Sequence, residues 1–112
     1  MPDTRGGVAV TIDGADYTMR LGFAAAIKLE KKVGPLVKLA ERMSRAEVSI
    51  EDVVHVLHAG IGGGLTVDQI GDAVMSDGVL AFVKPATELV IVSLTGGRKH
   101  KPAEGDEKKA VA

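Results

Sequence analysis

Two histidines three residues apart are the side chains in this chain best suited to chemistry. His55 and His58 share one face of a predicted helix, and Glu51 and Asp52 precede them by about one turn. Imidazoles and carboxylates in this arrangement could bind a divalent metal ion. A structural metal site usually has four protein ligands, but the chain has no cysteine, and its third histidine, His100, lies in a distant polar segment. We therefore predict no metal site.

A glycine-rich segment, residues 60–66, has the sequence Gly-Ile-Gly-Gly-Gly-Leu-Thr. Glycines of this kind can let backbone N–H groups approach a phosphate. A P-loop, however, follows a strand and ends in Gly-Lys-Ser/Thr, whereas this segment has no lysine and follows a predicted helix. We interpret it as a linker between helices.

The chain shows no recognisable catalytic arrangement. Its serines (Ser44, Ser49, Ser76 and Ser93) lie where helix caps or helix surfaces explain them. No nucleophile is paired with a base in a known pattern, and no cofactor motif is present. We predict a protein that is not an enzyme, has no catalytic or cofactor-binding residues and works by binding another protein. A metal-dependent enzyme that uses the two histidines is the weakest alternative.

Charge is divided unevenly along the chain, whose net charge is −1. Residues 1–97 carry nine basic and twelve acidic side chains, and no lysine or arginine occurs between Val48 and Val83. Binding to a nucleic-acid backbone needs many cations, so we do not expect it. The basic cluster at residues 98–101 is followed by acidic residues, which favours a solvated tail. A small nucleic-acid-binding regulator remains an alternative.

The pattern of the chain predicts an α+β fold, with an N-terminal β-hairpin followed by a bundle of four to five short helices. The strands are expected at residues 8–12 and 17–21, with a turn at residues 13–16 that contains Asp13-Gly14. Helices are expected at about 22–33, 35–45, 50–60, 66–75 and 79–95. Ser49 and Thr66 begin capping-box patterns, and Pro85 should kink or split the last helix.

We expect three parts: a flexible N-terminus (1–7), a single domain (8–96) and a disordered polar tail (97–112). The domain's core should be aliphatic, because only three of its residues are aromatic. Self-association would help stabilise such a core. The longest apolar stretch, residues 85–94, is too short to cross a membrane. With no apolar signal segment at the N-terminus, we expect a cytoplasmic protein that does not enter a membrane.

The order of these elements resembles the gene-transfer-agent type of phage tail assembly chaperones, a family that has also been labelled a tail tube protein. The likeness covers residues 8–96 and is carried by an ordered set rather than by one motif. It comprises the Asp13-Gly14 hairpin, residues 17–21, Phe23, Leu29-Glu30, Gly34, Leu36, the segment from Ser49 to Gly60, Leu65, the helix from Thr66 to Val74 and the ending Leu94-Thr95-Gly96.

The resemblance implies a role in the assembly of phage, prophage or gene-transfer-agent tails. Such chaperones bind the tape-measure protein, help tail tube subunits polymerise around it and then leave the particle. Amphipathic helices with aliphatic stripes suit this role. We therefore predict partner contacts by one helical face, formed by Phe23, Leu29, Leu36, Leu39 and Met43. The alternative for all five is burial in the core, and the alternative function is a structural tail component that stays in the particle.

Overall fold

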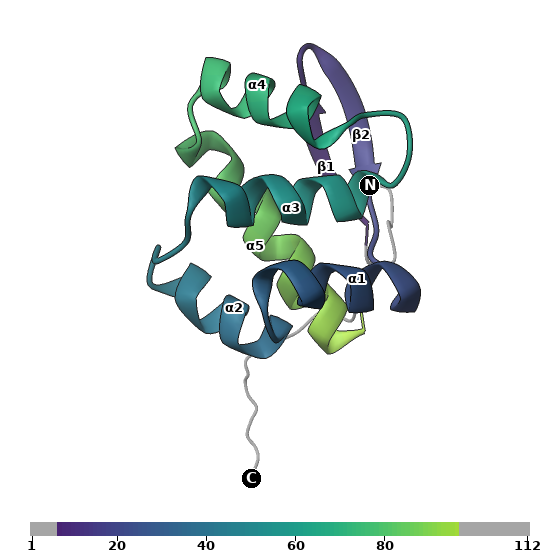
Figure 1. Cartoon of the computed structure of the whole chain (residues 1–112), viewed down its shortest axis with the longest axis vertical. Helices are drawn as coiled ribbons and strands as arrows, with labels where there is room; N and C mark the ends of the chain where they lie inside the picture. Colours follow the sequence, from purple (N-terminus) through teal and green to yellow (C-terminus); the bar gives the residue numbers. More distant parts are fainter. Residues whose placement is uncertain (1–6, 97–112) are drawn as a thin grey trace, which may run out of the picture.

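The computed structural model describes residues 7–96, which form a β-hairpin and five helices (Figure 1). The elements are β1 (Val8–Ile12), β2 (Ala15–Met19), α1 (Phe23–Val33), α2 (Leu36–Ser44), α3 (Ile50–Ile61), α4 (Val67–Asp77) and α5 (Leu80–Thr95). The predicted α+β class is confirmed. The predicted flexible N-terminus and disordered tail lie outside the described residues, except for Gly7.

The hairpin turns more tightly than the sequence pattern suggested. Asp13 and Gly14 both have positive φ (53° and 82°), as a two-residue type I′ turn requires. Ala15 therefore pairs directly with Ile12, and the second strand begins at residue 15 instead of the predicted 17. The two strands form the only sheet of the described residues.

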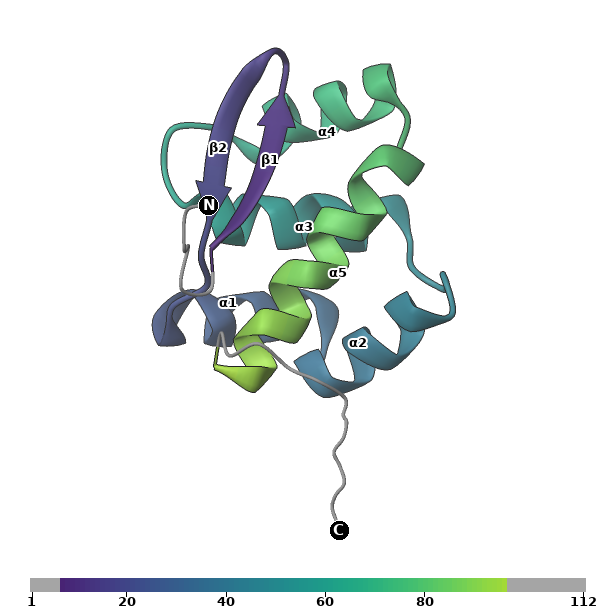
Figure 2. The same ribbon diagram turned by 180° about the vertical axis from the view of Figure 1, so that it is seen from behind.

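Helix α3 lies across the middle of the domain and touches most of the other elements (Figures 1 and 2). It packs against α1, α4, α5 and β2, while α5 crosses behind it and contacts α2 and β1. Helix α4 and the tip of the hairpin lie at one end of the domain, and α1 and α2 lie at the other. These two ends carry different charges, as described below.

The core is aliphatic, as predicted, with a single buried aromatic ring. Its buried members are Val8, Val10, Ile12, Met19, Leu29, Leu36, Leu39, Met43, Val53, Val54, Val56, Leu57, Ile70, Ala73, Val74, Phe82, Ala86, Leu89 and Val90. On β1 every second residue is buried, so one face of the hairpin covers the helices and the other faces solvent.

Both predicted capping boxes are confirmed. The Ser49 hydroxyl accepts a hydrogen bond from the Asp52 backbone N–H at 3.0 Å, and the Asp52 carboxylate accepts one from Ser49 N–H at 3.2 Å. Thr66 and Gln69 make the same reciprocal pair at 3.0 and 2.9 Å. These boxes satisfy N–H groups that would otherwise lack partners at the starts of α3 and α4.

Helix α5 continues through Pro85, so the predicted split of the last helix is wrong. A proline at this position removes one backbone hydrogen bond, the one that would run to the carbonyl of Ala81. Ala81 itself is an exposed residue. Phe82 is buried before the proline, and Ala86, Leu89 and Val90 are buried after it, so packing holds the helix on both sides of the proline.

Gly60 has a different role from the one expected. The sequence pattern placed it in the segment that ends the helix, but α3 continues to Ile61 and Gly60 is buried inside it. A Cβ atom at this position would lie 2.9 Å from Cβ of Met19 and closer still to Cδ2 of Leu89. The Gly60 carbonyl also accepts a hydrogen bond from Arg20 N–H at 3.0 Å. Gly60 therefore lets α3, α5 and the end of β2 meet closely.

Candidate partner-binding surface

Four of the five predicted partner-binding residues are core residues in the structure. Leu29, Leu36, Leu39 and Met43 are at most 4% exposed, and the face of α2 that holds three of them packs towards the interior, where α2 contacts α5. Phe23 alone is accessible, with 83% of its surface exposed. A partner that binds the folded domain can therefore touch Phe23 but not the other four.

Helix α1 buries the side that carries Leu29 and exposes the side that carries Phe23. Its inward side is centred on Leu29, with Ala26 and Val33 partly buried beside it. Ile27 lies two residues from Leu29, which is about 200° around the helix, so it faces outward. Phe23 and Ile27 are one turn apart and therefore form an exposed apolar pair on α1.

Other large apolar side chains are exposed elsewhere on the domain, at 41–82% of their surface. They are Val37, Ile50, Met75, Leu80, Ile91 and Leu94. Single exposed apolar residues are normal on protein surfaces. Met75 and Leu80 flank the corner between α4 and α5, and Phe23 and Ile27 follow one another along a helix. Among these exposed apolar residues only the α1 pair includes an aromatic ring, that of Phe23, which suits binding to an apolar partner.

A groove of about 400 Å³ runs between α1 and α3. It is lined by Ala24, Ala25, Lys28, Leu29, Lys32, His55, His58, Ala59 and Gly62. Four of these nine residues carry basic nitrogen and none is acidic. Small side chains make up most of the rest. The predicted histidine pair therefore does share one surface, but lysines lie opposite it instead of further metal ligands.

The two histidines have different surroundings within this groove. Burial, the positive charge of Lys32 and the neighbouring His55 lower the pKa of His58 below its usual value of 6.5. These surroundings favour the neutral form of His58. Nε2 of His55 lies 3.8 Å from Oε2 of Glu51, a residue that is itself highly exposed. In residues 7–96 there is no cluster of three or more histidine, aspartate or glutamate residues that could hold a metal ion.

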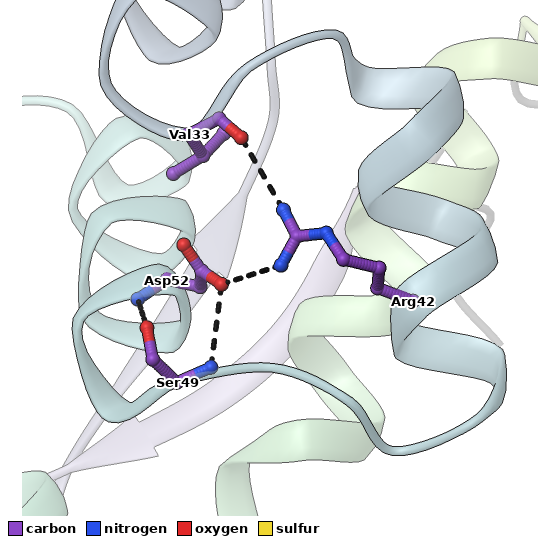
Figure 3. A network of polar contacts seen from close by, with 4 residues as sticks. All are labelled: Val33, Arg42, Ser49 and Asp52. Carbon is purple, nitrogen blue, oxygen red and sulfur yellow. Dashed lines mark hydrogen bonds and ion pairs between the residues drawn. The ribbon is translucent and has the colours of Figure 1, made fainter.

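An ion pair positions α2 relative to α3 (Figure 3). Nη1 of Arg42 donates to Oδ2 of Asp52 at 2.8 Å, and Nη2 donates to the Val33 carbonyl at 3.3 Å. Arg42 thus joins α2 to the start of α3 and to the end of α1. A second carboxylate, that of Glu30, accepts the N–H of Leu36 at 2.9 Å and caps α2 from the preceding helix.

The glycine-rich segment links two helices, as predicted. Gly62 ends α3 with φ of 88°, Gly64 has φ of 97°, and Thr66 then caps α4.

Within the part of the chain that the structure describes, no helix is both long and apolar enough to cross a membrane.

Comparison with known families shows what this domain is related to. A model of the family described as "Phage tail tube protein, GTA-gp10" matches residues 5–96. The chain belongs to this family. It is therefore related to the tails of phages or gene transfer agents, which confirms the predicted resemblance. No curated protein and no solved structure gives a significant match.

Membership of the family implies interactions with other tail proteins and is consistent with a structural, non-enzymatic role. The family description names a tail tube protein, which fits the alternative of a structural tail component as well as it fits a chaperone.

Two features of these helices were not predicted from the sequence. The α1–α3 groove was not predicted, although Lys28 and Lys32 at i and i+4, like the two histidines, signal a shared face. The Arg42–Asp52 pair was also missed, because nothing in a spacing of ten residues says that two helices bring their side chains together.

Proposed function

We propose that this tail protein is an assembly chaperone. In this role it binds the tape-measure protein, keeps that long partner soluble and assists the polymerisation of tail tube subunits around it. It acts in the cytoplasm of the bacterial host and is absent from the mature particle. Its action is non-catalytic and depends on protein–protein contacts.

One observation supports this role above the others: residues 7–96 contain ten strand residues and five helices. Tail tube walls are typically built from β-rich subunits that extend sheets from one neighbour to the next. A two-stranded hairpin offers little sheet for such a wall. Short helices with exposed apolar side chains are suited instead to covering the apolar faces of a long helical partner.

The exposed pair on α1, Phe23 and Ile27, is the proposed contact with the tape measure. An aromatic and a branched side chain one turn apart can enter an apolar stripe of a partner helix. Each contact of this size is weak. A long tape measure offers many such sites, and copies that bind neighbouring sites and also touch each other would be held more strongly than one copy alone.

The test is co-expression with the tape-measure protein encoded nearby, followed by pull-down and size-exclusion chromatography. We expect a soluble complex with several chaperone copies per tape measure. A variant with Phe23→Asp and Ile27→Asp should stay folded and leave the tape measure insoluble. Val37→Asp with Leu80→Asp, at two other exposed apolar positions, is the matched control and should behave like the wild type.

A structural tail component is the second candidate, and the family description fits it equally well. Mass spectrometry of purified particles distinguishes the two roles. A chaperone should be missing from complete particles, whereas a structural component should be present in many copies. Finding the chain at high copy number would overturn the proposed function even if it also bound the tape measure.

A further inference from the structure

The two ends of the domain have opposite electrostatic character. The hairpin (7–19) together with the segment from the α3–α4 linker to the start of α5 (62–79) carries five aspartates and no lysine or arginine. At the other end α1 carries three lysines and one glutamate. The acidic end includes α4 and the basic end includes α1, with α3 between them (Figure 1).

The basic end contains the α1–α3 groove, which has the form of a receptor for a helix. Lys28 and Lys32 are both exposed and lie one turn apart along α1, so their two positive charges lie on the same side of the helix. Ala24, Ala25 and Ala59 line the groove between them and α3. Because these side chains are small, a second helix could approach closely and place its own side chains in the groove.

Helix α4 has the complementary surface. Asp68 and Asp72 are exposed and one turn apart, and the exposed Met75 continues the same stripe. Ile70 and Val74 are fully buried on the opposite side, so the stripe faces away from the core. Within residues 7–96 neither aspartate takes part in an ion pair; the ion pairs of this part of the chain lie on α2, α3 and the loop between them.

We propose that α4 of one copy of this chain docks in the α1–α3 groove of a second copy. Asp68 and Asp72 would pair with Lys28 and Lys32, while Met75 would lie against the alanines of the groove. Such a contact uses two different surfaces and is therefore heterologous. Since the two surfaces lie at opposite ends of the domain, a copy does not satisfy its own groove, and association continues head to tail into a ring or a filament.

A second copy fits this groove better than a nucleic acid does. The groove has two lysines and no arginine, whereas a phosphate backbone needs a longer row of cations. The two lysines instead match two carboxylates at the same helical spacing. The proposal concerns self-association and stands apart from tape-measure binding, because it uses the lysine side of α1 and leaves Phe23 and Ile27 available.

The experiment is sedimentation velocity on the full chain over a concentration series, at low and at high salt. We expect species larger than a monomer that grow with concentration and dissociate in high salt, because exposed charge pairs are screened. A groove variant with Lys28→Glu and Lys32→Glu should raise the dissociation constant at least about tenfold, since like charges would then face each other. Lys31→Glu with Lys38→Glu makes the same change in net charge outside the groove and should associate like the wild type.

A charge exchange makes the test specific. A variant with Asp68→Lys and Asp72→Lys should also be monomeric alone, yet an equal mixture with the groove variant should associate, because each then offers the other an opposite charge. If the lysine variant fails to fold, as judged by circular dichroism, the milder Asp68→Asn with Asp72→Asn variant still tests the loss of association.

Three results would overturn the proposal. The first is a wild type that stays monomeric at every concentration in low salt. The second is a groove variant that associates as strongly as its control. The third is a groove whose lysines are needed for binding the tape measure or a labelled DNA duplex but not for self-association. Loss of self-association with intact tape-measure binding in the groove variant would support the proposal and leave the proposed function untouched.

Discussion

Arg42 and Asp52 are joined by an ion pair of 2.8 Å between Nη1 and Oδ2, and this pair connects the end of one helix to the start of another. The same oxygen of Asp52 also accepts the backbone N–H of Ser49, so one carboxylate both caps α3 and holds α2 in place (Figure 3). The side chain of Asp52 is only 17% exposed, which limits how well water can replace a lost partner.

Asp52→Ala should therefore destabilise the domain by about 1–3 kcal/mol, because it removes the cap and leaves Arg42 without its carboxylate. Chemical denaturation followed by circular dichroism measures this. Glu51→Ala, one residue away and 82% exposed, is the control and should change stability by less than about 0.5 kcal/mol. Equal effects of the two substitutions would show that Asp52 has no special structural role.

Gly60 gives a second prediction about packing. Gly60→Ala should cost about 1–3 kcal/mol, since the added methyl group would meet Met19 and Leu89. Gly71 is the matched control: it is also inside a helix, and a Cβ there would meet nothing within 4 Å. Gly71→Ala should stabilise the protein by about 0.5–1 kcal/mol. Thermal melts of both variants measure these changes in stability. A Gly60→Ala variant as stable as the wild type would contradict the close approach of Gly60 to Met19 and Leu89.

Substitutions in the predicted partner-binding face should change stability by different amounts, depending on whether the residue lies in the core or on the surface. Leu39→Ala should lower the free energy of unfolding by about 2–5 kcal/mol, because Leu39 is fully buried. Phe23→Ala should change it by less than about 0.5 kcal/mol, since 83% of Phe23 is exposed. Urea denaturation of both variants tests this, and a large loss of stability in Phe23→Ala would place that ring in the core.

Acid should weaken the folded state through His58. Burial, Lys32 and His55 lower the pKa of this imidazole in the folded protein, so the unfolded chain binds the proton more tightly. The contribution of His58 is therefore complete above its unfolded pKa of about 6.5 and is lost as the pH falls through the region below it. His58→Gln should flatten the dependence of stability on pH between about 7 and 5. Denaturation at a series of pH values measures the slope, and an unchanged slope would rule out this residue as its source.

Local features of the fold could be read from the sequence because each depends on residues close together in the chain. The capping boxes at Ser49 and Thr66 need only a hydroxyl and a side-chain acceptor three residues later. The hairpin needs Asp13-Gly14 between two β-branched runs. Its second strand was misplaced by two residues, because composition alone does not distinguish a two-residue turn from a four-residue one.

Burial was harder to predict for α1 than for α2. On α2 one apolar stripe, Leu36, Leu39 and Met43, leaves no choice of face. Helix α1 has apolar residues nearly all round in its first half, so the pattern allowed Phe23 and Ile27 to be placed in the core. Which side of α1 is buried depends on where α3 and α2 pack, because both helices lie against the side of α1 that carries Leu29.

The sequence alone was enough for the α+β class, the order of hairpin and helices, the aliphatic core and the family, because these follow from local periodicity, capping residues and the ordered pattern along the chain. Only the folded arrangement determined which apolar residues stay exposed, why Gly60 must be small, and that two lysines of α1 lie across a groove from two histidines of α3. The physical reason is that these properties depend on contacts between segments tens of residues apart, whose relative placement is set by packing of the whole core.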